Sequence, residues 1–316
     1  MILLWGVPGD DPLDDVGDEL ARLGADLRLL DQRRVCEATV TVATAAPAVG
    51  ASVTTDDATL DLSAVGAAYI RPQESSERGR LADIALLAWA DLTSAGVVNR
   101  PAAMAANNSK PYQLALIERL GFDVPDTLVT TDPEQARRFR RRHRRVVYKS
   151  VSGVRSIVSQ LHDEDLGRLD DVGSAPTQFQ QYVAGDDVRA HVVGDEVLAT
   201  RVRSGADDYR YAARSGAAVE VAEVALPDDV ARRCRAAVRG MGLHVAGVDL
   251  RHAPDGRWVC FEVNPSPAFT FYERATGQPI ANAVARLLIG LDRLEAGASR
   301  PRAGRDSPAP ARGAER

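Results

Sequence analysis

Apolar runs and helix-spaced apolar residues alternate along the first hundred residues. The predicted strands are residues 2–7, 26–30, 67–72 and 97–99, and the predicted helices are residues 12–23 and 81–90. Gly24 is suited to end the first helix. Because strands that alternate with helices favour a parallel sheet, residues 1–100 are predicted to form an N-terminal α/β domain.

Two further units follow in the pattern. In residues 101–185 the predicted helices are 105–120 and 133–142, and the extended segments are 124–130, 146–150 and 177–183. In residues 186–297 two hairpins are predicted, 188–193 with 196–203 and 245–250 with 258–263, together with helices at 229–241 and 280–291. Residues 298–316, rich in Pro, Arg, Ala and Gly, are predicted to be a disordered tail because they offer little apolar surface to bury.

Composition excludes several classes of protein. The chain has 316 residues, of which 45% are apolar and 26% charged, as in soluble proteins with several lobes. It contains no apolar run long enough for a membrane span, and its first residues lack the basic start of a signal peptide. The three cysteines have no C-x-x-C spacing, which argues against a zinc site and fits a reducing cytoplasm. A net charge of −5 does not favour nucleic-acid binding.

One segment is strongly basic, although the chain as a whole is acidic. Residues 137–145 contain seven arginines and one histidine among their nine positions. The favoured interpretation is a solvated helix face and its C-terminal end, where cations suit the helix dipole. A docking site for an acidic partner or peptide is the alternative.

The strongest chemical signal is a set of oxygen-bearing side chains on two neighbouring strands. Asp249 lies near the end of one predicted strand, and Glu262 and Asn264 stand two residues apart on the next. Residues two apart leave the same face of a strand, so the three side chains meet if the strands pair. Such oxygens suit Mg²⁺. A polar strand end that caps a turn is the simpler alternative.

Two other features suit a nucleotide. Lys110 and Lys149 are the only lysines of the chain, and Lys149 lies on an apolar strand where its charge requires an anion such as phosphate. After Gln180-Gln181-Tyr182-Val183, whose strand edge can pair with adenine, Asp187 can accept from a ribose hydroxyl and Arg189 can hold phosphate. Surface lysines and an ion pair on a sheet face are the alternatives.

The order of these motifs along residues 98–290 resembles the ATP-grasp superfamily. The stretches Phe261-Glu262-Val263-Asn264-Pro265-Ser266-Pro267 and Gly185-Asp186-Asp187-Val188-Arg189 resemble the ribosomal-protein S6 glutamate ligase (RimK) group. The stretch Asn108-Ser109-Lys110-Pro111-Tyr112 also resembles graspetide (microviridin-type) peptide ligases.

The resemblance implies an α/β ATP-grasp fold: an N-terminal α/β lobe, a lid subdomain at 101–185 and a metal-binding subdomain at 186–297. It also implies a site for ATP and Mg²⁺. Lys110 and Lys149 would contact the α- and β-phosphates, Gln181, Tyr182 and Val183 would line the adenine pocket, and Asp187 would bind ribose. Asp249, Glu262 and Asn264 would hold two Mg²⁺, with Arg189 and Arg210 facing the γ-phosphate and the acyl phosphate.

The implied function is an ADP-forming carboxylate–amine ligase that forms an amide through an acyl phosphate, on an amino acid or a peptide. One alternative is a ligase that recognises the leader of a ribosomal precursor peptide and forms ester or amide crosslinks. Another is an ATP-grasp kinase or nucleotide-binding regulator. A glycine-poor turn at residues 151–154 and Ala268, where the glutamate ligases usually have glycine, depart from the pattern. The acceptor and the presence of a homo-oligomer are left open.

Overall fold

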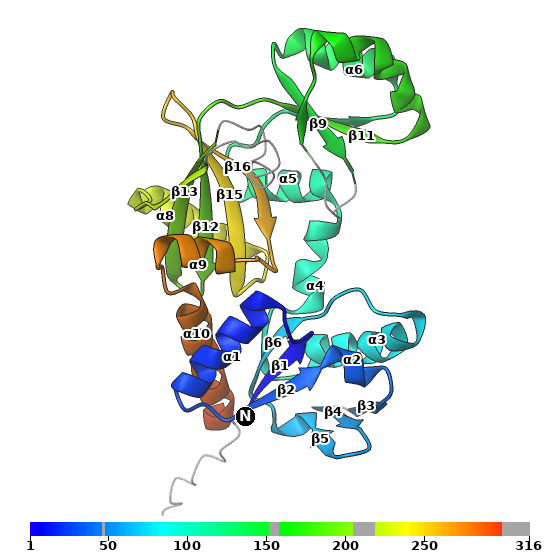
Figure 1. The fold of residues 1–316 in the computed structure, drawn as a ribbon, viewed down its shortest axis with the longest axis vertical. Coiled ribbons are helices and arrows are strands. Elements are labelled where there is room, and N and C mark those ends of the chain that lie inside the picture. Colours follow the sequence, from blue (N-terminus) through cyan, green and yellow to red (C-terminus); the bar gives the residue numbers. More distant parts are fainter. Residues whose placement is uncertain (46–47, 152–157, 205–218, 299–316) are drawn as a thin grey trace, which may run out of the picture.

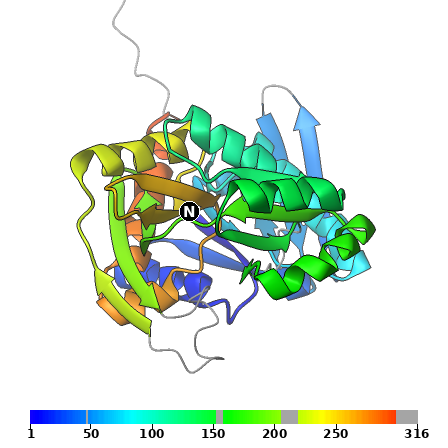
Figure 2. The ribbon, with the colours of Figure 1, turned by 90° about the horizontal axis from the view of Figure 1, so that it is seen from above.

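The protein is described here by a computed structural model that covers residues 1–45, 48–151, 158–204 and 219–298. The N-terminal lobe forms the lower part of the molecule in Figure 1, and the lid and a five-stranded sheet form the upper part. From above, the lid and that sheet lie side by side (Figure 2). The predicted tail and most of the predicted turn at 151–154 lie outside the described residues. None of the helices in these ranges is long and apolar enough to cross a membrane.

The N-terminal lobe is built on the predicted parallel sheet. Its strands are β1 (Ile2–Gly6), β2 (Leu27–Asp31), β6 (Ala67–Arg71) and β7 (Gly96–Val98), in the order β2-β1-β6-β7. Helix α1 (Asp11–Arg22) packs its buried leucines and valine on one face of the sheet, while α3 (Glu77–Leu92) packs on the other. Alternate residues of β1 therefore enter two different cores.

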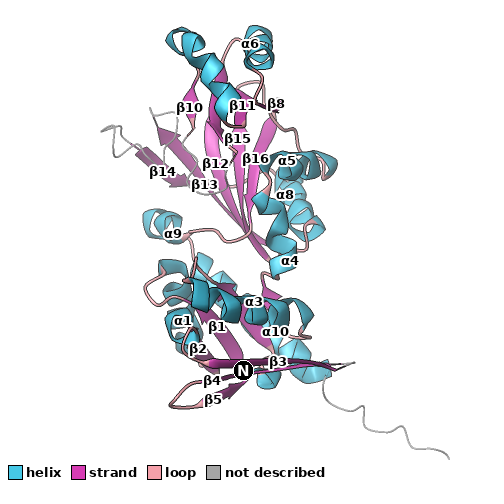
Figure 3. Ribbon diagram, turned by 90° about the vertical axis from the view of Figure 1, so that its right-hand side faces the viewer, coloured by secondary structure: helices cyan, strands magenta, loops and turns pink. Residues whose placement is uncertain are grey.

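A three-stranded antiparallel meander in this lobe was not predicted. It comprises β3 (Thr39–Ala45), β4 (Ala48–Thr54) and β5 (Thr59–Asp61), and α2 (Gln32–Val35) precedes it. Val40 and Val42 of β3 pack partly buried against the core that α3 covers, whereas Thr39 and Thr41 are exposed. The signal was an apolar–polar alternation with the period of a half-buried strand. Figure 3 shows the meander along the bottom edge of the lobe.

The predicted helix at 105–120 is wrong in its first part. The chain instead forms α4 (Pro101–Met104), a 3₁₀ turn η2 (Ala105–Asn108), and then α5 (Lys110–Arg119). Ser109 between them is extended, with φ of −134°. Pro111 explains the break, because proline lacks an N–H and fits only the first turn of a helix. The new helix start brings Lys110 toward the five-stranded sheet.

The lid is a four-stranded antiparallel sheet covered on one face. The order is β10-β9-β11-β8, with β8 (Thr127–Thr130), β9 (Val146–Ser150), β10 (Ser159–Gln160) and β11 (Thr177–Gln181). Helix α6 (Pro133–Arg142) and the 3₁₀ helix η3 (Asp163–Ser174) cover the face that carries Val146 and Phe179. Because side chains alternate, Val147, Lys149 and Gln180 leave the opposite face.

The five-stranded antiparallel sheet contains both predicted hairpins. Its order is β14-β13-β12-β15-β16, with β12 (Asp186–Val193), β13 (Glu196–Ser204), β14 (Val219–Glu223), β15 (Val245–His252) and β16 (Trp258–Asn264). Helix α8 (Asp228–Gly240) buries one face. The other face carries the charged residues of the site. The short helix α9 (Thr270–Thr276) lies near β14 and α1.

The last helix returns to the N-terminal lobe. Helix α10 (Ile280–Ala298) packs along α1, β6 and β7 (Figure 1). The junction is also polar: Asn99, just after β7, donates to the carbonyls of Val245 and Pro265 and accepts from the N–H of His244. The N-terminal lobe is therefore fixed to the start of β15 and to the loop that follows β16.

Candidate active site between the lid and the five-stranded sheet

A pocket of about 850 Å³, part of it open to solvent, separates the lid from the five-stranded sheet. Its walls come from β9 and β11 above and from β12, β15 and β16 below. The predicted site residues that line it are Lys149, Gln181, Tyr182, Val183, Asp187, Asp249 and Glu262. The structure thus brings into one cavity residues that are more than a hundred positions apart.

Two acidic residues face each other on the floor. Asp249 of β15 is paired with Glu262 of β16 in the strand register, and the register shifts just after Asp249. Asn264 lies one step farther along the same face, opposite Gly247, where its Oδ1 accepts from the N–H of Ser266 at 2.9 Å. The three predicted metal ligands therefore share one face at one end of the strand pair.

Each of the two carboxylates has a cation beside it. Arg189, directly opposite Asp249 in the β12–β15 register, donates to Oδ1 of Asp249. The Nζ of Lys110 lies 3.4 Å from both carboxylate oxygens of Glu262. The side chains of Arg189 and Lys110 are only 8% and 11% exposed, so these charges are poorly screened by water.

The guanidinium of Arg189 occupies the space that a side chain at position 247 would need. A methyl group at Gly247 would fall 2.5 Å from Cζ and 2.6 Å from Nε of Arg189, far inside normal contact. The buried ring of Tyr272 lies 5.8 Å from the guanidinium carbon. The glycine thus leaves room for the cation to reach Asp249.

His191 extends this buried face behind Arg189. Its ring packs edge-on against Tyr272 at 5.0 Å and Phe269 at 6.4 Å, and neither ring nitrogen has a partner among the described residues. Burial, together with the charge of Arg189, lowers the pKa of His191 well below its ordinary value. This histidine is therefore neutral at pH 7. Of the aromatic residues after β16, Phe269 and Tyr272 are core residues, whereas Phe271 is exposed.

The roof of the pocket combines Val147 with the polar side chains of Lys149 and Gln180. Its side wall is the segment that follows β11, residues 182–185, which we call the hinge. Gln180 is buried and donates to Oγ1 of Thr127 at 3.0 Å. The guanidinium carbon of Arg145 lies 3.5 Å from the centre of the Tyr182 ring. Gly185 has φ of +138°, and a methyl group there would lie 2.8 Å from the carbonyl carbon of His252. The hinge backbone therefore rests directly on the end of β15.

The family follows from the sequence of this part of the chain. Residues 106–288 match the family described as RimK-like ATP-grasp domain. The chain belongs to the RimK-like ATP-grasp family. The predicted superfamily and fold are confirmed.

Curated relatives and solved structures agree with that assignment. The probable alpha-L-glutamate ligase of Marinobacter nauticus is 28% identical over 59% of this chain and 65% of its own length. The probable alpha-L-glutamate ligase of Chromohalobacter salexigens is 28% identical over 69% of this chain and 73% of its own length. The chain thus matches about two thirds of the length of these relatives.

The likeness to solved structures extends over nearly the whole fold. The ATP-grasp ligase PsnB, complexed with a phosphomimetic variant of its minimal precursor, Mg and ADP, has a TM-score of 0.79. It is 26% identical, over 92% of this chain and 98% of that one. The macrocyclase MdnC of Microcystis aeruginosa, bound with the precursor peptide MdnA, shares the fold with a TM-score of 0.76. It is 20% identical, over 92% of this chain and 100% of that one.

The donor atoms of this RimK-like site fit Mg²⁺. Asp249, Glu262 and Asn264 offer carboxylate and amide oxygens, the ligands that a hard cation prefers. A Mg²⁺ ion also binds phosphate oxygens, and Lys149 of the facing lid lines the same cavity. The residues present are therefore suited to a nucleotide with its metal.

One charged residue that lines the pocket was not assigned to the site from the sequence. Arg251 of β15 lines the cavity and donates to Asp187 and to the carbonyl of Val183. Its place in the site follows from the β12–β15 register, which sets it opposite Asp187 and which the sequence alone does not give. Arg210, a predicted catalytic residue, lies outside the described residues.

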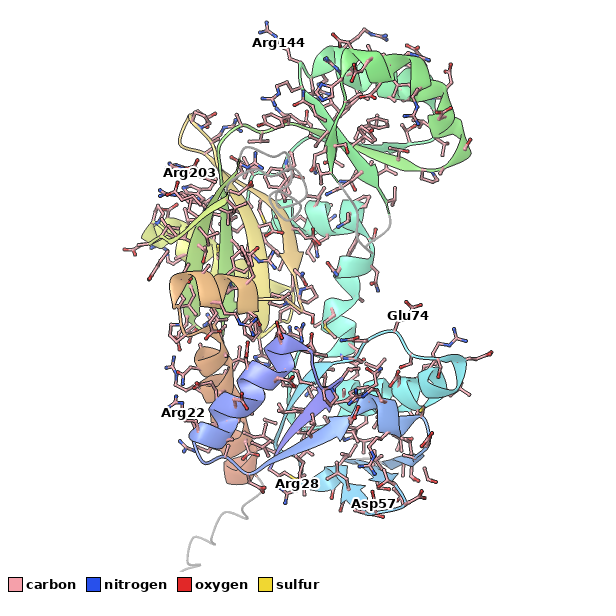
Figure 4. All side chains as sticks on the ribbon, in the orientation of Figure 1. Arg22, Arg28, Asp57, Glu74, Arg144 and Arg203 are labelled. Carbon is pink, nitrogen blue, oxygen red and sulfur yellow. The ribbon has the colours of Figure 1, made fainter. Side chains whose placement is uncertain are left out.

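The basic segment 137–145 is engaged mainly in local contacts. Arg137, Arg140, Arg141 and Arg142 form ion pairs with Asp170, Asp163, Glu134 and Asp126, in that order. Figure 4 shows Arg144 projecting outward from the lid. These contacts favour the interpretation as a solvated helix face and its end.

Proposed function

We propose that this chain is an ADP-forming carboxylate–amine ligase that activates a carboxyl group as an acyl phosphate and transfers it to an amine. The observation that carries the proposal is the opposed pair of Asp249 and Glu262, each beside a cation, on the floor of a cavity whose roof carries Lys149. Phosphoryl transfer needs this combination of hard oxygens and cations more than it needs a protein nucleophile.

The nucleotide is proposed to lie with its base at the hinge and its phosphates at the acidic floor. Gln181, Tyr182 and Val183 would line the adenine, with buried Gln180 behind them, and Asp187 would accept from the ribose. Lys110 and Lys149 would bind the α- and β-phosphates. Asp249, Glu262 and Asn264 would hold Mg²⁺, which would neutralise negative charge on the phosphates.

The residues of the chain would then act in two stages. The substrate carboxylate attacks the γ-phosphorus, the bond to the β-phosphate oxygen breaks, and ADP leaves. Arg189 stabilises the negative charge on the transferred group, and Arg210 is proposed to assist. The amine then attacks the acyl carbon, the carbon–oxygen bond to phosphate breaks, and the amine proton is lost to solvent or phosphate. The lid above the pocket would exclude water from the acyl phosphate.

A peptide is the favoured substrate. The likeness to PsnB covers 98% of that chain, including its counterpart of the N-terminal lobe, and those PsnB structures contain a precursor peptide. The match to the glutamate ligases covers 65% and 73% of their lengths. A modification of a ribosomal precursor peptide, forming an ester or amide crosslink, is therefore the second candidate. A kinase or regulator is disfavoured because all three metal-ligand positions carry oxygen donors.

The test is ADP release with Mg²⁺ and ATP across free amino acids, dipeptides and acidic peptides, with the mass of each product recorded. A condensed product, lighter by one water than its components, supports the ligase. ADP release together with a stable phosphorylated product would contradict it.

The site assignment has its own control. Glu262→Gln keeps the size of the side chain but removes its charge, and should abolish turnover. Glu220→Gln, an exposed position on edge strand β14 of the same sheet, should leave turnover unchanged. Substantial turnover by Glu262→Gln would refute the metal assignment.

A further inference from the structure

Arg251 contacts the two parts of the pocket that are proposed to hold the nucleoside. Its Nε donates to Oδ1 of Asp187 at 2.8 Å, and its Nη2 lies 2.7 Å from the same oxygen. Its Nη1 donates to the carbonyl oxygen of Val183 at 2.6 Å. The proposed reaction gives this residue no chemical step.

The arrangement around Arg251 is rigid. Its side chain is 15% exposed, and its guanidinium carbon lies 5.4 Å from the centre of the Phe261 ring. A guanidinium is planar and rigid. Here one edge binds the carboxylate of Asp187 and another binds the carbonyl of Val183, so the guanidinium fixes the carboxylate and the carbonyl relative to each other. Arg251 therefore links the hinge to the carboxylate proposed to receive the ribose.

The backbone between these two contacts is held by the same strand end. Gly185 lies against the backbone of His252 and Ala253. A methyl group at Gly185 would lie 2.8 Å from the carbonyl carbon of His252 and 3.0 Å from the Cα of Ala253. Asp187, in turn, is paired with Arg251 in the register of β12 and β15. Val183, Gly185 and Asp187 thus each contact the end of β15 or the residue that follows it.

We infer that Arg251 is a positioning residue that orients Asp187 toward the ribose hydroxyls and so makes the site selective for ribonucleotides. The inference rests on the proposed function, because it takes Asp187 as the ribose acceptor. By donating to Oδ1, Arg251 fixes the direction in which the second oxygen of Asp187 points. An ion pair that only stabilised the fold would affect nucleotides with and without these hydroxyls equally.

The experiment compares ADP with 2′,3′-dideoxyADP, each titrated in Mg²⁺ buffer by calorimetry. The unmodified protein should bind ADP about tenfold more tightly, the effect of one hydrogen bond to a charged acceptor. Asp187→Asn and Arg251→Gln should each bring the ratio of the two Kd values close to one. Arg251→Gln should add little in the Asp187→Asn background, because both changes remove the same interaction.

Arg203→Gln is the matched control. Arg203, labelled in Figure 4, forms an ion pair with Asp186, but its side chain is 50% exposed and is not among the residues that line the pocket. This variant should keep the ADP preference. If Arg251→Gln does not fold, as judged by circular dichroism, Arg251→Lys provides the same measurement, and it should lose most of the preference because an ammonium cannot hold both partners through one planar group.

The possible results separate the inference from the function on which it rests. An equal loss of ADP and dideoxyADP affinity in the Arg251 variant would make the residue structural and overturn the inference. So would a protein that binds both nucleotides equally well from the start, since Asp187 would then not serve the ribose. A protein that binds neither nucleotide would instead refute the proposed function itself.

Discussion

Gly247→Ala should separate catalysis from stability in this protein. Glycine within a strand costs about 0.5–1 kcal/mol relative to alanine, so propensity alone predicts a more stable variant. The contacts predict the opposite. The new methyl group would lie 2.5 Å from Cζ of Arg189, whereas ordinary contact begins at 3.4 Å. Nη2 of Arg189 would be nearest, at 2.4 Å, so the guanidinium must move by about 1.0 Å (3.4 − 2.4).

That displacement sets the expected size of the effects. Overpacking in a close-packed region costs about 1–3 kcal/mol, which should offset the propensity gain of about 0.5–1 kcal/mol and leave the variant less stable by about 0–2.5 kcal/mol. A charged group misplaced by about 1 Å costs on the order of 100-fold in rate. We therefore expect kcat to fall about 100-fold in a variant that still folds.

The assay is the rate of ADP release at saturating ATP, with urea unfolding of the same samples. Gly50→Ala is the control, because Gly50 also lies within a strand, β4, but has nothing within 4 Å of the added methyl. It should match or exceed the parent stability and keep the parent kcat. A Gly247→Ala variant with kcat within twofold of the parent would refute the claim that Arg189 must lie on this glycine to act.

Three other predictions concern groups away from the reacting atoms. Because the folded-state pKa of His191 lies below its ordinary 6.5, the unfolded chain binds more protons below that pH. The free energy of unfolding should thus fall by up to about 1.4 kcal/mol per pH unit below 6.5, and His191→Leu should flatten this slope in urea titrations at pH 5 and 7.5. Burial raises the pKa of Cys234 to about 12 and that of Cys260 well above its ordinary value. Iodoacetamide should therefore modify only half-buried Cys36 in the native protein, as mass spectrometry would show; early labelling of either buried thiol would contradict this. Arg71→Met should destabilise the protein by about 1–3 kcal/mol in urea unfolding, because it leaves Asp10 of a partly buried ion pair without its cation, and unchanged stability would show that the pair contributes nothing.

The elements that the sequence predicts well carry their own local signals. Residues 133–142 form a helix with the predicted bounds because Asp132 caps its N-terminus, with hydrogen bonds to the N–H groups of Glu134 and Gln135, and Pro133 starts it. The first hairpin turns at Gly194, which has φ of +57°. Signals of this kind depend on adjacent residues and can be read without tertiary structure.

The elements that were missed or misplaced depend on competing signals or on distant contacts. The strands of the meander are rich in threonine and alanine, and each buries only one side, so no continuous apolar run marks them. The apolar residues before Lys110 have helical character, but Pro111 and extended Ser109 divide the segment. Helix α10 follows the five-stranded sheet in sequence, yet its apolar face matches α1. Nothing near α10 in the sequence specifies that partner.

The same contrast holds for the site: residue types can be read from the sequence, whereas the register between strands cannot. Residue types and their order in short motifs were enough to group Asp187, Asp249 and Glu262 into one candidate site, and the structure places all three along one pocket. Gly247 and Arg251 matter because of how β15 is aligned with β12. That alignment places Gly247 against the guanidinium of Arg189, and it places Arg251 beside Asp187. A single sequence does not specify a register between strands separated by fifty residues or more.

That register also determines the charge balance of the acidic floor. Two carboxylates one strand apart repel each other, and burial strengthens the repulsion. Here Arg189 from the neighbouring strand and Lys110 from the start of α5 each neutralise one of them. Under the proposed function, nucleotide phosphates would compete for these two cations, and Mg²⁺ would compete for the two carboxylates. We therefore expect ADP to bind more tightly in the presence of Mg²⁺ than in its absence, because each ligand would release the groups that the other needs.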